Sequence, residues 1–129
     1  MKLLGLDYGL KRIGLAYSEG SLASPMGKLT VTSVADAMEK VLRTAHTYEV
    51  EKIVVGLPDP DRIGAKEFGE KLQKASGLTI DYVDETLTSK EGLERLKTNS
   101  LKKRKALIDS AAATLILASY LEGNKLTPR

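Results

Sequence analysis

The first third of the chain is patterned as short apolar runs separated by polar turns. Residues 2–7 form an apolar run of strand length that ends in an acid, and residues 9–12 read as a turn. Residues 13–17 form a second apolar run, so these segments together predict a β-hairpin. A third short strand is expected at residues 28–31.

Two later runs predict further strands. Residues 52–57 are β-branched and nearly all apolar, which is typical of a strand buried on both faces of a parallel sheet. A polar loop punctuated by proline follows at residues 58–62. Residues 78–83 alternate apolar and polar side chains and predict one more strand.

Apolar residues recur at helical spacing between these strands. Residues 34–45 carry such a pattern, and Ser33 with Asp36 three positions later favours the start of a helix just before it. Residues 65–75 form a second amphipathic stretch with one apolar stripe. Each of these two segments therefore predicts a helix that packs on the sheet.

Two further helices are expected toward the end of the chain. A capping pattern predicts one that begins at residue 88, and a long helix is expected over residues 105–121, ended by Gly123. The order β-β-β-α-β-α-β-α-α predicts an α/β fold, a mixed five-stranded sheet flanked by helices. With 129 residues and no linker or repeat, we expect a single domain, residues 1–129.

Composition narrows the class of protein. Hydrophobic residues make up 42% and charged residues 29%, as in globular proteins, and the absence of cysteine excludes disulfides, zinc–thiolate sites and thiol catalysis. Asp7, Lys11 and Arg12 interrupt the apolar start, so no signal peptide or membrane span is predicted, and we expect a cytoplasmic protein without membrane association. A net charge of +3 permits a polyanionic partner without requiring one.

Acidic residues follow two of the predicted strands. Asp7 ends the first strand, and Asp84 and Glu85 follow the last one. A turn aspartate can cap its own backbone, and acids near a helix N-terminus are favourable, so each acid has an ordinary explanation. The alternative is metal binding, because sites of open α/β sheets form at the carboxyl ends of strands. Glu85 is the preferred ligand because its side chain reaches further, with Asp84 as the fallback.

Asp109 lies in a largely apolar part of the last predicted helix. An acid in such surroundings must be paired, hydrogen-bonded or bound to metal, and Lys105 one turn earlier is one possible partner. Residues 111–113 are all alanine, and such small side chains let a helix approach a sheet closely. That approach would bring Asp109 to the strand ends.

Asp7, Glu85 and Asp109 together predict a carboxylate cluster that is both metal-binding and catalytic. Mg²⁺ and Mn²⁺ prefer oxygen ligands. Two such ions about 4 Å apart can activate water and stabilise the leaving oxygen of a phosphodiester. We therefore expect one or two Mg²⁺ or Mn²⁺ ions and the hydrolysis of phosphodiester bonds.

Four segments, in this order, resemble motifs of the YqgF family. Residues 7–16 (DYGLKRIGLA) are similar to its opening motif, and residues 54–58 (VVGLP) to its central strand and turn. Residues 84–89 (DETLTS) resemble its acidic motif, and residues 105–117 its final helix. The resemblance spans nearly the whole chain.

The resemblance implies a ribonuclease H-like fold and a nuclease, linked to maturation of the 16S rRNA 5′ end and earlier to resolution of four-way DNA junctions. By matched position, Asp7, Glu85 and Asp109 would form the acidic site, with Lys11 and Arg12 at its rim in contact with nucleic acid. Related junction resolvases carry an acid on the central strand. Here residues 56–58 read Gly-Leu-Pro, as is usual in the family. The resemblance therefore implies that the next strand supplies the acid.

A basic run precedes Asp109 in the sequence. The run and one nearby residue are Lys102, Lys103, Arg104, Lys105 and Lys97. A solvated helix start would explain such a run by itself. Beside an active site, the same residues are expected to contact the backbone of a nucleic acid. Tyr8 could stack on a base, but a packing role is the favoured interpretation.

The sequence leaves four functions to compare. The leading hypothesis is a metal-dependent nuclease, a hydrolase acting on ester bonds, that processes the 5′ end of pre-16S rRNA during ribosome biogenesis. Cleavage of branched DNA is the alternative, and it would favour a homodimer over a monomer. A non-catalytic RNA-binding ribosome-assembly factor is the third. An actin-like ATPase is disfavoured, because those proteins close two such domains over a nucleotide and this chain has room for one.

Overall fold

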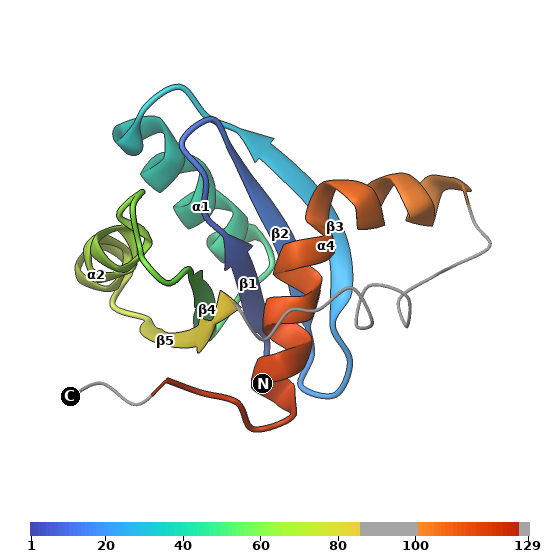
Figure 1. The fold of residues 1–129 in the computed structure, drawn as a ribbon. Coiled ribbons are helices and arrows are strands. Elements are labelled where there is room, and N and C mark those ends of the chain that lie inside the picture. The colour runs from blue at the N-terminus through green and yellow to red at the C-terminus, as the bar shows by residue number, and fades with distance from the viewer. Residues whose placement is uncertain (86–100, 127–129) are drawn as a thin grey trace.

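The computed structural model describes residues 1–85 and 101–126, with the side chains of residues 1–85 and 110–126. These residues contain a mixed five-stranded sheet of order β3-β2-β1-β4-β5 (Figure 1). Strands β1, β4 and β5 are parallel, and β2 is antiparallel to both β1 and β3. The predicted α/β architecture is confirmed. The strands are β1 (Leu3–Asp7), β2 (Arg12–Ser18), β3 (Ser24–Thr30), β4 (Lys52–Leu57) and β5 (Thr79–Asp84).

Helices cover both faces of the sheet. Helices α1 (Val34–Thr47) and α2 (Ala65–Ser76) pack on one face, and α4 (Leu101–Leu121) packs on the other (Figure 1). The two earlier helices match the predicted segments, whereas α4 begins four residues before the predicted residue 105. The helix expected from residue 88 lies outside the described residues. None of the described helices is both long enough and apolar enough to cross a membrane.

The pleat of β1 divides its side chains between two hydrophobic cores. Leu4 and Leu6 lie in the core under α1 and α2, and Leu3 lies in the core under α4. Gly5 also faces α4, because a Cβ atom there would be 2.9 Å from Leu117 Cβ and 3.1 Å from the Ala113 carbonyl oxygen. The expected close approach of the alanine-rich helix is confirmed, and it depends on this glycine.

Both helices on the first face start from side-chain caps. Ser33 Oγ accepts a hydrogen bond from the Asp36 backbone N–H at 3.0 Å, which confirms the predicted start of α1. The α2 cap was not predicted. The Asp61 carboxylate accepts hydrogen bonds from the backbone N–H groups of residues 64–66 at 2.9–3.1 Å. This cap fixes the loop between β4 and α2.

Strand β3 differs from the prediction of residues 28–31, because it starts four residues earlier. The added residues include Pro25, which is tolerated because β3 is an edge strand. Its pairing with β2 shifts register between Leu15 and Ala16, and Gly27 takes a φ of 91° at that bulge.

Candidate active site at the carboxyl edge of the sheet

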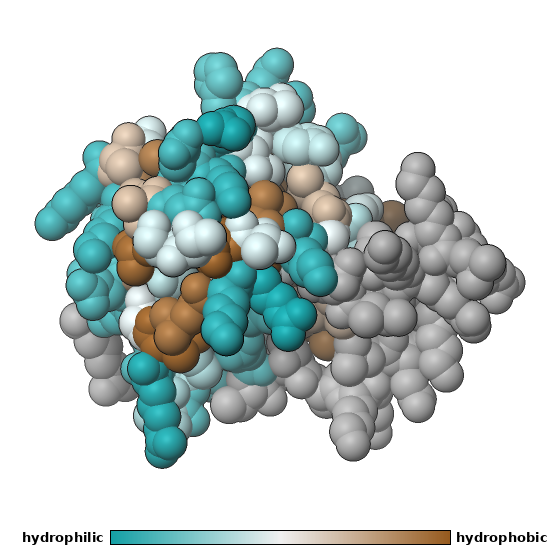
Figure 2. Space-filling view, turned by 90° about the horizontal axis from the view of Figure 1, so that it is seen from above, coloured by the Kyte–Doolittle hydropathy of each residue, from teal (hydrophilic) through white to brown (hydrophobic). Residues whose placement is uncertain are grey.

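The three parallel strands end at the same edge of the sheet. Strand β1 ends at Asp7, β4 at Leu57 and β5 at Asp84, with Glu85 in the turn that follows. The turn from β1 to β2 and the start of α1 lie at the top of the molecule in Figure 1, and Figure 2 looks down from above. Two of the predicted acids are therefore brought to one edge by the parallel pairing.

Strand pleat decides which acid can meet Asp7. Asp7 is two residues after Gly5 on β1, and alternate residues of a strand point to the same face. The side chain of Asp7 therefore lies on the face covered by α4. On β5, Val83 belongs to the core under α4, and Glu85 continues that alternation. Asp84 lies between Val83 and Glu85 in the sequence, so its side chain is directed toward the face covered by α1 and α2. The structure thus brings Glu85, rather than Asp84, beside Asp7.

Asp7 and Glu85 form a hydrogen-bonded pair of carboxyl groups. Burial, followed by the hydrogen bond with Asp7 and the charge of Asp7, raises the pKa of Glu85 from 4.5 to about 7. A hydrogen bond between two carboxyl groups requires a proton on one of them. Near neutral pH the pair holds a proton that a positive ion could replace.

Gly56 of β4 lies between the two strands that carry these acids. Leu6 pairs with Val55, so Gly56 follows the position of β4 that pairs with the residue before Asp7, and Gly56 itself pairs with Val83. Because β4 lies between β1 and β5, the two acids come from strands roughly 9–10 Å apart and meet across it. Glycine leaves this position of β4 without a side chain.

Ile116 explains why residue 56 is glycine. A Cβ atom on Gly56 would lie 2.3 Å from Ile116 Cδ1 and 2.8 Å from Ile116 Cγ1. Helix α4 therefore fills the space above Gly56, and an acidic side chain at this position would collide with it. This contact could not be predicted from the sequence, since it joins residues 60 positions apart.

Asp109 belongs to α4, but its side chain lies outside the described residues. Ala113 packs over Gly5, and the helix runs from Tyr120, beside Asp81, toward the carboxyl edge. Asp109 is about one turn beyond Ala113 in that direction. The helix changes course at Ser110, where φ is −130° and ψ is 20° (Figure 1). Within the side chains that are described, no three His, Asp or Glu residues could hold a metal ion together.

The predicted basic residues that the structure describes lie at two places, the β1–β2 turn and the first part of α4. Lys11 and Arg12 are exposed at the β1–β2 turn, and this turn is fixed by a 2.9 Å hydrogen bond from the Val31 N–H to the Lys11 carbonyl oxygen. Lys97 lies outside the described residues. The other four lie on the first part of α4, where only the backbone is described: Lys102, Lys103, Arg104 and Lys105.

Tyr8, the residue after Asp7, has a packing role. Its side chain is 7% exposed and its ring stacks on Phe68, with ring centroids 4.2 Å apart and planes inclined by 18°. The favoured interpretation from the sequence is confirmed. Tyr8 and Asp7 point to opposite faces, so one strand end contributes to both the core and the acid pair.

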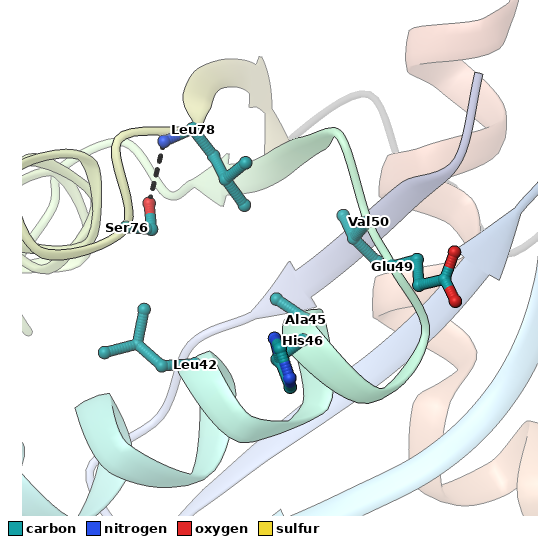
Figure 3. Close-up of a pocket in the computed structure, with 7 residues that line it drawn as sticks. All are labelled: Leu42, Ala45, His46, Glu49, Val50, Ser76 and Leu78. Atoms are coloured by element: carbon teal, nitrogen blue, oxygen red, sulfur yellow. Dashed lines mark hydrogen bonds between the residues drawn. The ribbon is translucent and has the colours of Figure 1, made fainter.

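A separate hollow of about 410 Å³ lies at the other end of the sheet, where β4 and β5 begin (Figure 3). Leu42, Ala45, Val50 and Leu78 provide apolar walls. Ser76 accepts a 3.0 Å hydrogen bond from the Leu78 N–H, so its hydroxyl group already has a partner. This hollow is remote from Asp7 and has no acid pair.

Comparison with known proteins identifies the family of this chain. The sequence profile of the RuvX family, described as a Holliday junction resolvase, matches residues 1–123. The chain belongs to the RuvX family. The match includes Asp7, Glu85 and Asp109, and it confirms the expected YqgF relationship.

RuvX relatives and solved structures agree with this assignment. A protein of Syntrophomonas wolfei named "Putative pre-16S rRNA nuclease" is 36% identical over 98% of this chain and 97% of its own length. RuvC of Thermus thermophilus, solved with a Holliday junction substrate, has a TM-score of 0.66 at 16% identity over 98% of this chain and 99% of its own. The fowlpox virus Holliday junction resolvase has a TM-score of 0.65 at 12% identity, over 95% and 99%. The ribonuclease H-like fold is confirmed, and the RuvX relatives are named as nucleases.

Proposed function

We propose that this chain is a divalent-metal-dependent nuclease that cuts RNA during 5′-end processing of pre-16S rRNA in the cytoplasm. The observation that carries the proposal is the hydrogen-bonded pair of Asp7 and Glu85 at the carboxyl edge of the sheet. A strongly perturbed carboxyl group beside a second one is typical of a functional site. The RuvX relationship and the name of the Syntrophomonas relative support the choice of reaction and substrate.

The acid pair fits Mg²⁺ or Mn²⁺. Two carboxyl groups that share a proton supply hard oxygen ligands and an excess of negative charge once the proton leaves. Asp7 and Glu85 would hold one or two ions, with Asp109 as a third ligand and Asp84 as the fallback for Glu85. A bound cation would supply positive charge that activates water and stabilises the leaving oxygen of the phosphodiester.

The chain's own residues would bind and orient the substrate. Lys11 and Arg12 are exposed at the turn that follows Asp7, where their charges would neutralise the phosphate being cut. The basic residues at positions 97 and 102–105 would contact the backbone on the other side of Asp109. Glu85 must lose its proton to act as a ligand, so cation binding competes with protonation and should weaken as the pH falls.

A cleavage assay tests this function. An RNA that bears the 16S 5′ leader is incubated with Mg²⁺ or Mn²⁺ and either the wild-type chain or the Asp7→Asn variant. We expect the wild type to cut and the variant to lose about 1,000-fold in rate, because charge stabilisation worth several kcal/mol is removed. The variant should stay folded, since asparagine can still hydrogen-bond to Glu85. Equal cleavage by both proteins would contradict the role of Asp7.

Branched DNA is the second candidate substrate, and the description of the RuvX family as Holliday junction resolvases favours it. A four-way DNA junction is offered in the same assay. Symmetric cutting of a junction needs two active sites, so this function requires a homodimer, whereas a monomer suffices for RNA. Junction cleavage by a dimer would replace the RNA proposal. RNA binding without cleavage of either substrate would favour a ribosome-assembly factor.

A further inference from the structure

Lys28 of β3 lies in the same cross-strand row as Asp7. Asp7 of β1 pairs with Gly14 of β2, and Gly14 pairs with Lys28, so the row runs from the end of β1 to the outer strand of the sheet (Figure 1). Residues directly opposite each other on antiparallel strands place their side chains on one face. The Lys28 side chain therefore leaves the sheet on the same face as the Asp7 carboxylate, the face covered by α4.

The core residues of β2 and β3 support this assignment of faces. Ala16, two residues after Gly14, belongs to the core under α4, whereas Ile13 belongs to the core under α1 and α2. On β3, Leu29 pairs with Ile13 and packs against the core under α1 and α2. Because Lys28 is the neighbour of Leu29 on a regular stretch of strand, its side chain points to the opposite face.

The glycine of β2 leaves the sheet without a side chain between Asp7 and Lys28. Strands β1 and β3, on either side of Gly14, are roughly 9–10 Å apart. The flexible four-carbon stem of Lys28, which is exposed, can bring its ammonium group over Gly14. About one strand spacing, roughly 5 Å, then remains between the ammonium group and Asp7, which is wide enough for one phosphate group.

Arg12 adds a second positive charge on this face. It lies two residues before Gly14 on β2, so its side chain also points to the face covered by α4, and it is exposed. Arg12 pairs with Thr30, two residues after Lys28, which makes Arg12 and Lys28 diagonal neighbours about 7–8 Å apart. Two exposed cations on β2 and β3 therefore share the face of the acid pair.

A lysine on an edge strand also has an ordinary role, because its charge keeps the open edge from pairing with another chain. That role needs only an exposed charge, and either face of β3 would serve it. It does not account for the position of Lys28 in the row of Asp7, with a glycine between them. A role of the charge at the acid pair does account for it.

We propose that Lys28 contacts the phosphodiester held at Asp7 and Glu85, and that its charge stabilises the phosphate oxygens while the bond is cut. The inference rests on the proposed nuclease function for the identity of the substrate. Negative charge develops on the phosphate oxygens as the bond breaks, so a fixed positive charge beside them lowers the barrier. Lysine suits this purpose as a compact point charge.

The salt dependence of RNA binding tests the contact without any cleavage. Binding of the RNA that bears the 16S 5′ leader is measured in EDTA, which removes divalent cations, over a range of salt concentrations. Lys28→Gln should weaken binding and reduce the slope of log Kd against log salt by about 0.7, the value for one phosphate of a single strand. Lys71→Gln, which removes an exposed lysine of α2 on the opposite face, is the matched control and should leave the slope unchanged. Equal slopes for Lys28→Gln and the wild type would overturn the inference.

The absence of cysteine from the chain permits chemical rescue at one chosen position. With Mg²⁺, Lys28→Cys should cut the same RNA about 100-fold more slowly than the wild type, the lower limit for loss of one charge-stabilising group. Alkylation of the new thiol with bromoethylamine restores an ammonium group at the length of lysine and should recover most of the rate. Iodoacetamide adds a neutral group and should not. Wild-type rates in Lys28→Cys, or equal recovery with both reagents, would overturn the inference.

The two tests separate the Lys28 contact from the nuclease function. Suppose that the wild type binds RNA with a slope that depends on Lys28, yet cuts nothing. That result would remove the nuclease proposal and keep the phosphate contact. Cleavage by the wild type, with no effect of Lys28 on either the slope or the rate, would keep the nuclease and overturn the contact.

Discussion

Asp81 and Glu85 lie four residues apart on the same face of the sheet, in opposite electrostatic surroundings. Asp81 is 6% exposed, accepts a 2.6 Å hydrogen bond from the Tyr120 hydroxyl, and pairs with Lys52 at 3.0 Å and Lys125 at 3.3 Å. Burial by itself would raise the pKa of Asp81. The hydrogen bonds from Tyr120 and Lys52 and the positive charge of Lys52 outweigh it, so the pKa is lowered.

The pKa of Glu85 is shifted in the opposite direction, because the charged group that acts on it is another acid, Asp7. That pKa is raised to about 7 by burial and by Asp7. An acid that the protein has surrounded with its own cations serves the fold, since its charge is already compensated. An acid placed beside a second acid binds a proton more tightly and attracts an added cation, and this contrast separates function from structure at the two acids.

The Asp81 cluster also holds the helix that carries Asp109. Tyr120 comes from the end of α4, and its hydroxyl bridges Asp81 and Lys52, which donates to it at 2.8 Å. The chain after α4 also contacts β5, where the Leu126 N–H donates to the Tyr82 carbonyl oxygen at 2.8 Å. The amino end of the parallel strands therefore anchors the carboxyl end of α4.

The largest effect is expected for Asp81→Asn. The substitution removes the negative charge that compensates the largely buried ammonium group of Lys52. The free energy of unfolding, measured by urea denaturation, should therefore fall by about 3 kcal/mol. Activity in the folded fraction should stay near that of the wild type. Glu39→Gln, which removes an exposed pair with Arg43, is the control and should cost less than about 1 kcal/mol. A loss of unfolding free energy in Asp81→Asn no larger than that of the control would contradict the role of Asp81 in holding α4 on the sheet.

The pH dependence of stability should separate the two acids. The pKa of Asp81 is lowered, so its contribution is present above about pH 4 and is lost as the pH falls below that value. The pKa of Glu85 is raised from 4.5 to about 7, so the folded chain binds the extra proton and loses stability as the pH rises through this range. Without divalent cations, we expect a loss on the order of 2 kcal/mol between pH 4.5 and 7.5.

Asp7→Asn supplies the control for this pH profile. The asparagine amide can donate to an ionised Glu85, so the decline in stability between pH 4.5 and 7.5 should become smaller, while the part caused by burial of Glu85 remains. Unfolding curves collected across that range for both proteins provide the measurement. An unchanged decline in the variant would mean that the Asp7–Glu85 pair does not cause it.

Gly56→Ala should have a smaller effect on stability, about 1 kcal/mol. The new Cβ atom would clash with Ile116 Cδ1, which is the end of a side chain that can shift, so the cost lies at the low end for overpacking. Ile116→Val shortens that side chain. The double variant should be more stable than the sum of the two single changes predicts. Additive losses would show that Ile116 does not fill the space above Gly56.

The elements around Asp7 could be predicted because their signals are local. The apolar run of β1, the β-branched run of β4 and the Ser33 cap each depend on residues close together in sequence. Strand β3 could not be predicted in full, because tolerance of Pro25 depends on its place at the edge of the sheet. Edge position is a property of the whole topology.

The acids of the candidate site could be predicted from the sequence, but their arrangement in space could not. The preference for Glu85 over Asp84 rested on side-chain length, whereas the structure explains the contact by strand pleat. The Asp81 cluster and the contact of Gly56 with Ile116 were missed, since they join β4 and β5 to α4 across more than 35 positions.

Binding of Mn²⁺ to two matched variants tests the central claim most directly. Isothermal titration calorimetry at pH 8, where Glu85 is ionised, would compare the wild type with Glu85→Gln and Asp84→Asn. We predict that Glu85→Gln weakens Mn²⁺ binding at least about 10-fold, as expected for loss of a carboxylate ligand, and that Asp84→Asn leaves it nearly unchanged. Loss of binding in Asp84→Asn with retention in Glu85→Gln would contradict the assignment of Asp7 and Glu85 as the cation site.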